Sequence, residues 1–210
     1  MVLERCRTPT DSVVDLGCST GSWSANWRKL GFARTVGVDV NPEVIEEAEA
    51  VLDEVHLGNS SVLRRVDGSI GLVAANGVVL HILEAEEVQR LSQDVYESLT
   101  PGGFFVVAVL DSRHYLSPDG FVPWTGPLSC TRTLEESLRL LTQAGFRHVE
   151  SVGTFINPWF CTHTLNLANQ ANLKTDRELF AGMTLIARSL RRAGLQELFA
   201  EYLMVLRKPI

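Results

Sequence analysis

The amino-acid sequence predicts an α/β fold in which helices cover both faces of a mostly parallel sheet. Apolar runs of strand length alternate along the chain with segments in which apolar residues recur at helical spacing. This alternation is typical of parallel sheets, because a crossover helix connects each strand to the next. Residues 104–110 are apolar throughout, which suits a central strand that is covered on both faces.

The first two strands are each expected to lead into a helix. Residues 13–16 form an apolar run, after which Trp23, Trp27 and Leu30 recur at helical spacing before Gly31. Residues 35–39 form the second strand, and the Asn-Pro pair at residues 41–42 is typical of a helix N-cap. We expect one helix after this cap, with an apolar face made of Val44, Ile45, Ala48, Leu52 and Val55.

The middle of the chain supplies two further strands. A third strand is expected near the start of residues 57–70, and residues 71–75 form a clearer fourth. A helix then follows and runs into a Thr-Pro-Gly-Gly turn at residues 100–103. Its apolar face is Val88, Leu91, Val95 and Leu99.

The last part of the chain combines a long loop, two strands and an apolar insertion. Prolines and glycines in residues 111–129 predict an ordered loop. Thr133 begins a capping-box pattern for a helix that closes at Gly145, and residues 146–152 and 202–206 form the last two strands. The insertion between these strands contains a helix whose apolar face is Leu179, Met183, Ile186 and Leu190.

Composition limits the class of protein. The chain has 210 residues, 45% of them hydrophobic and 21% charged, so one domain with a sizeable core is expected. The net charge of -6 argues against a broad nucleic-acid surface. No apolar run approaches the roughly 20 residues of a membrane helix, and residues 1–7 lack the pattern of a signal peptide. The four cysteines include no C-x-x-C pair, so we expect no zinc site, no disulfide framework and a cytoplasmic location.

The most informative feature is a glycine-hinged turn followed by a carboxylate. Gly17 and Gly21 lack side chains where the backbone could approach a ligand, and the next helix would point free N–H groups at an anionic group. Asp39 ends the second strand, where a carboxylate can accept hydrogen bonds from both hydroxyls of a ribose. The combination predicts an adenosine-containing ligand. The alternatives are a tight turn without a ligand and a carboxylate that only caps the helix at Pro42.

Three motifs occur in a characteristic order and spacing. They are Asp-Leu-Gly-Cys-Ser-Thr-Gly at residues 15–21, Val-Gly-Val-Asp at residues 36–39 and Leu-Thr-Pro-Gly-Gly at residues 99–103, with a weaker fourth at residues 70–76. In these motifs the chain resembles the class I S-adenosylmethionine-dependent methyltransferases, over about residues 12–150 and the final strand. The resemblance implies a Rossmann-like, doubly wound sheet of seven strands whose last strand is antiparallel. Ser19 and Gly71 depart from the family, which usually has glycine and often aspartate at these positions.

The resemblance also implies which residues bind the cofactor S-adenosylmethionine. They are Asp15, Gly17, Cys18, Gly21, Asp39, Val40, Asn59, Ser60, Asn76 and Gly77. Asp15 would lie near the ammonium end of the ligand, and Val40 would lie against the adenine unless it is ordinary core. Asn59 and Ser60 fall where family members place an acidic residue or an amide on the adenine amino group. The two residues after the fourth strand would pass close to the sulfonium centre through their backbone carbonyls.

Methyl transfer needs few catalytic side chains, because the sulfonium is already an activated donor. The protein must align a nucleophile, exclude water and sometimes remove a proton. The candidate catalytic bases are His81 and His114, together with Asp111, because the loops after the fourth and fifth strands open over the donor. His81 could instead be structural, and His148 is expected at the surface. Asp111 and His114 are too few ligands to predict a metal site.

Acceptor recognition is expected from residues 112–130 and 153–200, which the shared core does not explain. The aromatic residues Phe155, Trp159 and Phe160, with His163, suit a small apolar or planar acceptor, or they pack the insertion onto the sheet. We expect the insertion to cap the acceptor site in place of the N-terminal helix that forms a lid in many relatives. A second subunit in a homodimer is the alternative.

Two other functions are considered. A nicotinamide-dependent oxidoreductase shares the strand, turn and carboxylate, but Ser19 and Ser22 occupy the second and third glycine positions of its G-x-G-x-x-G motif. A non-catalytic domain that binds S-adenosylmethionine and serves as an interaction subunit would carry the same motifs.

Overall fold

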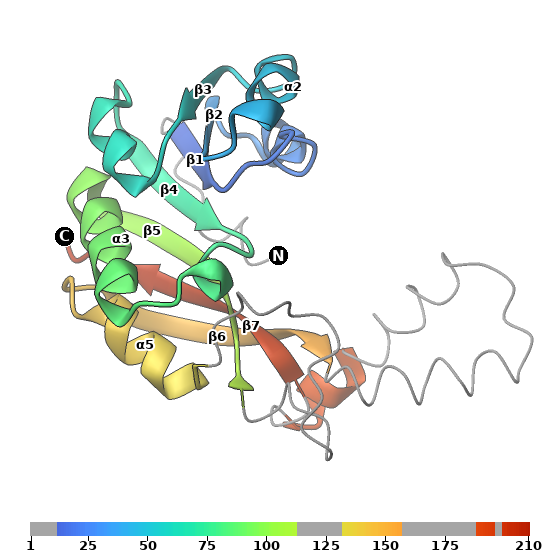
Figure 1. Cartoon of the computed structure of the whole chain (residues 1–210). Helices are drawn as coiled ribbons and strands as arrows, with labels where there is room; N and C mark the ends of the chain where they lie inside the picture. Colours follow the sequence, from blue (N-terminus) through green and yellow to red (C-terminus); the bar gives the residue numbers. More distant parts are fainter. Residues whose placement is uncertain (1–11, 113–131, 157–187, 196–198) are drawn as a thin grey trace, which may run out of the picture.

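Seven strands form one sheet in the order β3-β2-β1-β4-β5-β7-β6 (Figure 1). The computed structural model describes residues 12–112, 132–156, 188–195 and 199–210. The strands are β1 (Ser12–Leu16), β2 (Arg34–Asp39), β3 (Glu54–Leu57), β4 (Ile70–Ala75), β5 (Leu99–Leu110), β6 (Arg147–Ile156) and β7 (Phe199–Arg207). β7 pairs antiparallel with both β5 and β6, and the other pairs are parallel. The predicted fold class, including the antiparallel last strand, is confirmed.

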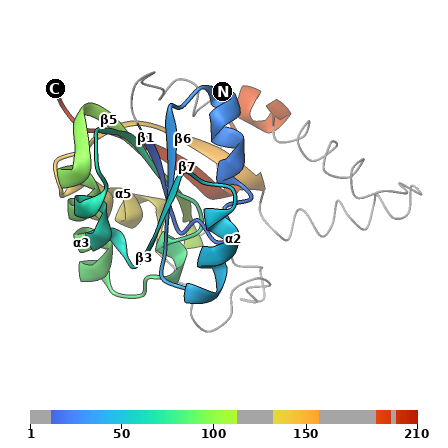
Figure 2. The ribbon, with the colours of Figure 1, turned by 90° about the horizontal axis from the view of Figure 1, so that it is seen from above.

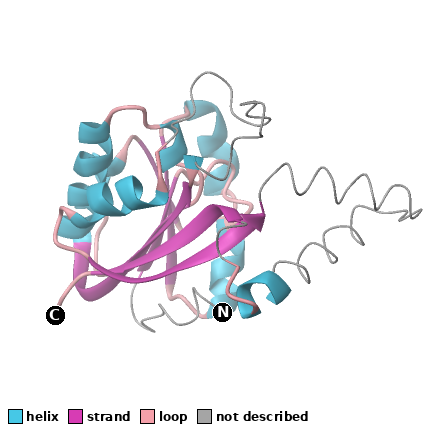
Figure 3. Ribbon diagram, turned by 90° about the horizontal axis from the view of Figure 1, so that it is seen from below, coloured by secondary structure: helices cyan, strands magenta, loops and turns pink. Residues whose placement is uncertain are grey.

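Helices lie on both faces of this sheet (Figure 2). The helices of the described residues include the 3-10 helices η1 (Ser24–Leu30), η2 (Pro42–Val44), η3 (Ser60–Arg65) and η4 (Val79–His81) and the α-helices α2 (Ile45–Glu49), α3 (Ala85–Ser98) and α5 (Leu134–Thr142). Alternate residues of each strand point to opposite faces. In β4, Val73 packs in the cluster that contains the apolar residues of η3, α3 and α5, whereas Leu72 packs with Trp27 of η1. In Figure 3, the helices that pack with Val73 lie together over one side of the strands.

The segment between β2 and β3 differs from the sequence prediction. Asn41 is the N-cap, as predicted, and its side chain accepts a hydrogen bond from the backbone N–H of Glu43 at 3.0 Å. The predicted single helix through Val55 is wrong, because α2 ends at Glu49 and Val55 lies in β3. Leu52 still packs with Ala48, since the chain passes the same buried cluster after it leaves the helix. The third strand begins at Glu54 and ends at Leu57, so it meets the start of residues 57–70, where it is expected, but begins three residues earlier.

Two other predicted boundaries shift. The spacing of Trp23 and Trp27 identifies η1, and Gly31 ends it in the left-handed conformation at φ 85°. Trp23, however, precedes the helix and is 55% exposed, while Trp27 is buried. The helix expected to run through Leu99 stops at Ser98, because Leu99 already pairs with Ile70 as the first residue of β5.

The later elements largely agree with the sequence. Thr133 and Glu136 form the predicted capping box of α5, with Thr133 Oγ1 accepting from the Glu136 N–H at 3.1 Å. Gly145 follows α5 with φ 108°. Most of the predicted loop at residues 111–129 and most of the insertion helix lie outside the described residues. None of the helices in the described ranges is long and apolar enough to cross a membrane.

Candidate functional site

The carboxyl ends of β1, β2 and β4 meet at one edge of the sheet. β1 lies between β2 and β4, so the strand order reverses beside it. In open α/β sheets, ligands bind in the crevice outside the carboxyl ends of the strands at such a reversal. The segments after these strands carry most of the residues that the sequence predicts to bind a ligand.

The donor loop, residues 17–21, follows β1 and is shaped by left-handed backbone conformations. Gly17, Ser19 and Gly21 have φ values of 81°, 49° and 72°. A Cβ atom on Gly17 would lie 2.4 Å from Cγ2 of Val78, so the packing of the segment after β4 also favours glycine at this position. The left-handed conformation of Ser19 explains why the related motif usually has glycine at this position, because a side chain there costs free energy.

Asp39 joins the donor loop to the end of β2. Its Oδ2 accepts a hydrogen bond from the Ser19 N–H at 2.8 Å, and its Oδ1 accepts one from the Asn41 N–H at 2.9 Å. A carboxylate has about four acceptor positions, so each oxygen can accept one further hydrogen bond. Asp39 does not cap the following helix, because Asn41 does so. The partly exposed carboxylate is therefore held by the backbone and can bind a pair of hydroxyl groups.

Asp15 is a buried carboxyl at the end of β1. Ser24 donates its hydroxyl proton to Oδ2 of Asp15, and only 4% of Asp15 is exposed. Burial raises the pKa of Asp15 to about 6, the Ser24 hydrogen bond opposes this rise, and the charge of Asp39 adds to it. Burial and the nearby negative charge of Asp39 both disfavour the ionised form of Asp15. A cation bound at this edge would therefore stabilise that form.

Cys18 packs beneath the donor loop. Its sulfur lies where a side chain on Gly37 would be, 2.8 Å from the position of a Cβ atom there, which explains the glycine in β2. Burial raises the pKa of the Cys18 thiol to about 12, with the charges of Asp15 and Asp39 adding to the effect. The thiol is therefore protonated at neutral pH and serves as a small packing group.

The segment after β4 borders the same edge. Asn76 is exposed, Gly77 has φ 77°, and the 3-10 helix η4 ends at His81, whose side chain is also exposed. Arg132 donates from Nη1 to the carbonyl of Ile82 at 2.8 Å, while its own carbonyl accepts from the Ser112 N–H at 3.0 Å. Arg132 thus connects the segment after β4 to the end of β5, where Asp111 is buried. His114 lies outside the described residues.

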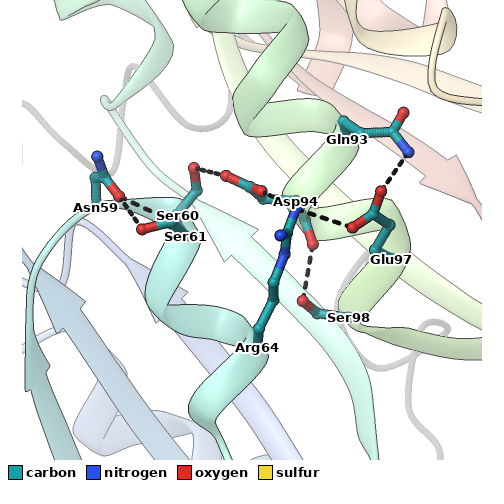
Figure 4. Close-up of polar contacts among 8 residues, drawn as sticks. All are labelled: Asn59, Ser60, Ser61, Arg64, Gln93, Asp94, Glu97 and Ser98. Carbon is teal, nitrogen blue, oxygen red and sulfur yellow. Dashed lines mark hydrogen bonds and ion pairs between the residues drawn. The ribbon is translucent and has the colours of Figure 1, made fainter.

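The helix η3 follows β3 and is tied to α3 by side chains (Figure 4). Ser60 donates its hydroxyl proton to Oδ2 of Asp94 at 2.8 Å, and Arg64 contacts Oδ1 of Asp94 at 3.0 Å and Glu97 at 2.9 Å. Asn59 caps η3, because its Oδ1 accepts from the N–H of Ser61 at 3.1 Å. Ser60 therefore has a structural partner, and its predicted ligand contact stays a prediction.

Solved structures with the same fold include a SAM-dependent methyltransferase from Methanosarcina mazei. It aligns with a TM-score of 0.66 and 16% identity over 100% of this chain and 97% of that chain. A structure described as the [4+2]-cyclase SpnF aligns with a TM-score of 0.63 and 18% identity over 100% and 79% of the two chains. At these identities the likeness establishes the fold alone.

Sequence relatives add information about the family. A ribosomal protein L11 methyltransferase of Bacillus cytotoxicus is 30% identical over 112 residues, which are 50% of this chain and 34% of that protein. The chain thus spans about a third of the length of the curated relatives that it matches. Residues 13–103 match a family model described as a methyltransferase domain. Over these residues the chain is similar to methyltransferase domains, and its fold is that of S-adenosylmethionine-dependent methyltransferases.

The chemistry of this edge of the sheet fits S-adenosylmethionine, the cofactor that the resemblance implies. Asp15 and Asp39 are two carboxyls at one edge of the sheet, and their mutual repulsion contributes to the raised pKa of Asp15. The sulfonium and ammonium groups of the cofactor are cations, which such a pair attracts. The match agrees with the resemblance seen in the sequence motifs.

The sequence did not indicate several residues of this candidate site. Ser24, Asp94 and Arg132 each fix a predicted site segment through contacts that no local motif indicates. Val40 lies beside Asp39 and is 69% exposed, so it is not ordinary core. His148 is exposed and hydrogen-bonded to Ser151, as the surface prediction requires. Within the described ranges, no three His, Cys, Asp or Glu residues are grouped as they would be around a metal ion.

Proposed function

We propose that the chain is an S-adenosylmethionine-dependent methyltransferase that acts on a small-molecule acceptor. The observation that carries the proposal is the position of Asp39, whose carboxylate accepts a backbone hydrogen bond from the donor loop and keeps acceptor capacity toward solvent. In this proposal Asp39 binds the ribose hydroxyls. The donor loop approaches the methionyl end through its backbone.

Other residues complete the donor site in this proposal. Asp15 stabilises the ammonium group directly or through water, which favours its ionised form despite burial. Val40, which is 69% exposed, covers one face of the adenine. The carbonyls of Asn76 and Gly77 lie toward the sulfonium centre. These roles follow from the family resemblance. They are supported by the positions of Asp15 near the end of β1, of Val40 directly after β2, and of Asn76 and Gly77 directly after β4.

The bound donor supplies an activated methyl group. The chain itself must orient the acceptor, exclude water and, for some acceptors, remove a proton. His81 is the candidate base among the described residues, because its exposed side chain ends η4 beside the predicted site. Asp111 is buried at the end of β5, which supports a positioning role more than direct proton transfer.

A small-molecule acceptor is favoured by charge. The net charge of -6 disfavours a broad surface for nucleic acid. We propose that residues 153–200 form the acceptor-site cap, a segment whose larger part lies outside the described residues. A protein acceptor is the second candidate, because the curated relative from Bacillus cytotoxicus is named for methylating a ribosomal protein. The family model ends at residue 103, before the segments proposed to bind the acceptor.

Two experiments, carried out one after the other, test the proposal. Thermal unfolding should shift upward with S-adenosylhomocysteine but not with NAD or NADP, since a ligand that binds only the folded state stabilises it. Stabilisation by NAD instead would favour the oxidoreductase. Methyl-labelled S-adenosylmethionine should then label a fraction of a small-metabolite extract. Label in protein would support the second candidate, and binding without any transfer would support a non-catalytic interaction domain.

A further inference from the structure

Asn59 lies directly beyond the proposed ribose site. Leu57, the last residue of β3, is the register partner of Asp39, and the N–H of Gly58 donates to the carbonyl of Asp39 at 2.8 Å. Asn59 is the next residue and is exposed. If the ammonium end of the ligand lies over β1 and the ribose at β2, the base must continue along the edge toward β3. The exposed side chains of Val40 and Leu57 flank this position with apolar surface.

The orientation of the Asn59 amide is determined by its neighbours. The backbone N–H of Ser61 can only donate, so the atom that faces it at 3.1 Å must be the amide oxygen. The Ser61 hydroxyl donates to the same oxygen at 2.7 Å. The oxygen is therefore engaged by two donors, and the amide nitrogen points away from Ser61 (Figure 4). No described residue accepts a hydrogen bond from this nitrogen.

The segment that carries Asn59 is anchored by charged groups. Ser60, the next residue, is buried and donates to Asp94 of α3 at 2.8 Å. Arg64 of η3 contacts the other oxygen of Asp94 at 3.0 Å. The anchoring fixes the start of η3, and with it the direction in which the Asn59 amide nitrogen is presented.

We propose that Asn59 determines base specificity by donating a hydrogen bond to N1 or N7, the ring nitrogens on either side of the adenine amino group. This inference rests on the proposed function. It reverses the polarity implied by the family resemblance, in which an acidic residue or amide accepts from the adenine amino group. Adenine offers acceptors at its ring nitrogens and a donor only at the amino group, so an amide nitrogen can pair only with the ring. The site should therefore depend on a ring acceptor and tolerate loss of the amino group.

Calorimetry with four ligands tests this polarity on the whole chain. The ligands are S-adenosylhomocysteine and its 6-deamino, 1-deaza and 7-deaza analogues. One deaza analogue, which lacks the paired ring nitrogen, should bind roughly 3- to 10-fold more weakly than S-adenosylhomocysteine, as expected for one hydrogen bond. The 6-deamino analogue should bind within about twofold of it, since no hydrogen bond to the amino group is lost.

The variant Asn59→Asp should invert the preference. A carboxylate keeps the cap on Ser61 but cannot donate, so the variant should lose sensitivity to both deaza analogues and become sensitive to loss of the amino group. Asn41→Asp is the matched control, because Asn41 caps η2 in the same way and the substitution adds the same charge. It should leave the wild-type preference unchanged.

The results separate this inference from the proposed function. Wild-type protein that binds S-adenosylhomocysteine but loses most affinity for the 6-deamino analogue would overturn the inference alone. Equal affinity for all four ligands would also overturn it. Failure of wild-type protein to bind S-adenosylhomocysteine would overturn the proposed function, and the inference with it.

Discussion

The donor loop and helix η3 border the same edge of the sheet but are held by different kinds of contact. The donor loop is fixed by its own backbone, through left-handed residues and N–H groups that bond to β2. Helix η3 is fixed by side chains, because Ser60 and Arg64 reach a carboxylate on α3 that is about thirty positions away in the sequence. Backbone geometry tolerates few residue types, whereas a side-chain link of this kind can be built from many.

The largest expected effect is on the first of these two regions. Asp39→Ala should weaken binding of S-adenosylhomocysteine by at least about 100-fold, since it removes the acceptor for two charge-assisted hydrogen bonds of roughly 1.5–3 kcal/mol each. Calorimetry on the folded variant measures this loss. Asp53→Ala is the control, because Asp53 accepts two hydrogen bonds from Thr35 at the other end of β2. It should lower stability and leave affinity unchanged.

Asp15 should make stability depend on pH. Its pKa is raised from 3.8 to about 6 in the folded protein, so the folded state binds more protons than the unfolded state between these values. Stability should therefore fall as pH rises through this window and reach a plateau above it. Asp15→Asn removes the titrating group, so the free energy of unfolding of this variant relative to wild type should rise by about 3 kcal/mol between acidic pH and pH 7.

Urea denaturation from pH 4 to pH 7 measures this trend, and a constant difference between the two proteins would contradict it. Glu136→Gln provides a control of opposite sign. The hydrogen bonds from Thr133 hold the pKa of Glu136 below its usual value. Its stabilisation is therefore present at neutral pH and is lost as pH falls below the ordinary range of a glutamate. The cost of Glu136→Gln should be greater at pH 7 than at acidic pH.

A smaller effect is expected in the second region. Asp94→Ala leaves the buried hydroxyl of Ser60 without its acceptor and should lower the free energy of unfolding by about 1–2 kcal/mol. Affinity for S-adenosylhomocysteine should fall only several-fold, because η3 is loosened but the donor loop is not. Glu97→Gln, which removes a contact to the exposed Arg64, should change neither quantity measurably. A loss of affinity as large as that of Asp39→Ala would remove the distinction between the two regions.

The smallest effect concerns Ser19. Its φ of 49° is left-handed, so Ser19→Gly should relieve local strain and raise stability by less than about 1 kcal/mol, partly offset by the greater freedom of glycine in the unfolded chain. Chemical denaturation measures the change. A clear destabilisation would mean that the Ser19 side chain makes a contribution that exceeds its strain.

The fold could be predicted from the sequence where burial leaves a regular pattern. Strand β4 and residues 105–109 of β5 are continuous buried runs without a charged residue, because both of their faces are covered. The bounds of strand β3 are hard to predict, because it lies at the edge of the sheet, is only partly buried and contains Glu54 and His56. The predicted helix after β2 is too long, because Leu52 and Val55 continue the helical spacing of apolar residues although α2 ends at Glu49.

The residues of the candidate site fall into two groups, those that a sequence motif indicates and those that it does not. Gly17, Gly21 and Asp39 stand out in the sequence because the turn after β1 uses left-handed glycines and a carboxylate that accepts from its backbone, and their contact with a ligand stays a prediction. Ser24, Asp94 and Arg132 do not stand out, since their roles arise only when distant segments meet. The orientation of the Asn59 amide belongs to this second group, because the sequence identifies an amide but not the atom that it presents.

The position of β7 has a consequence for the order in which the molecule can assemble. β5 and β6 are not neighbours in the sheet, because residues 199–207 lie between them. During synthesis the long apolar edge of β5 stays unpaired until this strand has left the ribosome, and unpaired edges of nascent chains are prone to aggregate. Productive folding of the second half is therefore tied to the arrival of its last strand, whereas β1 to β4 can pair as soon as they emerge.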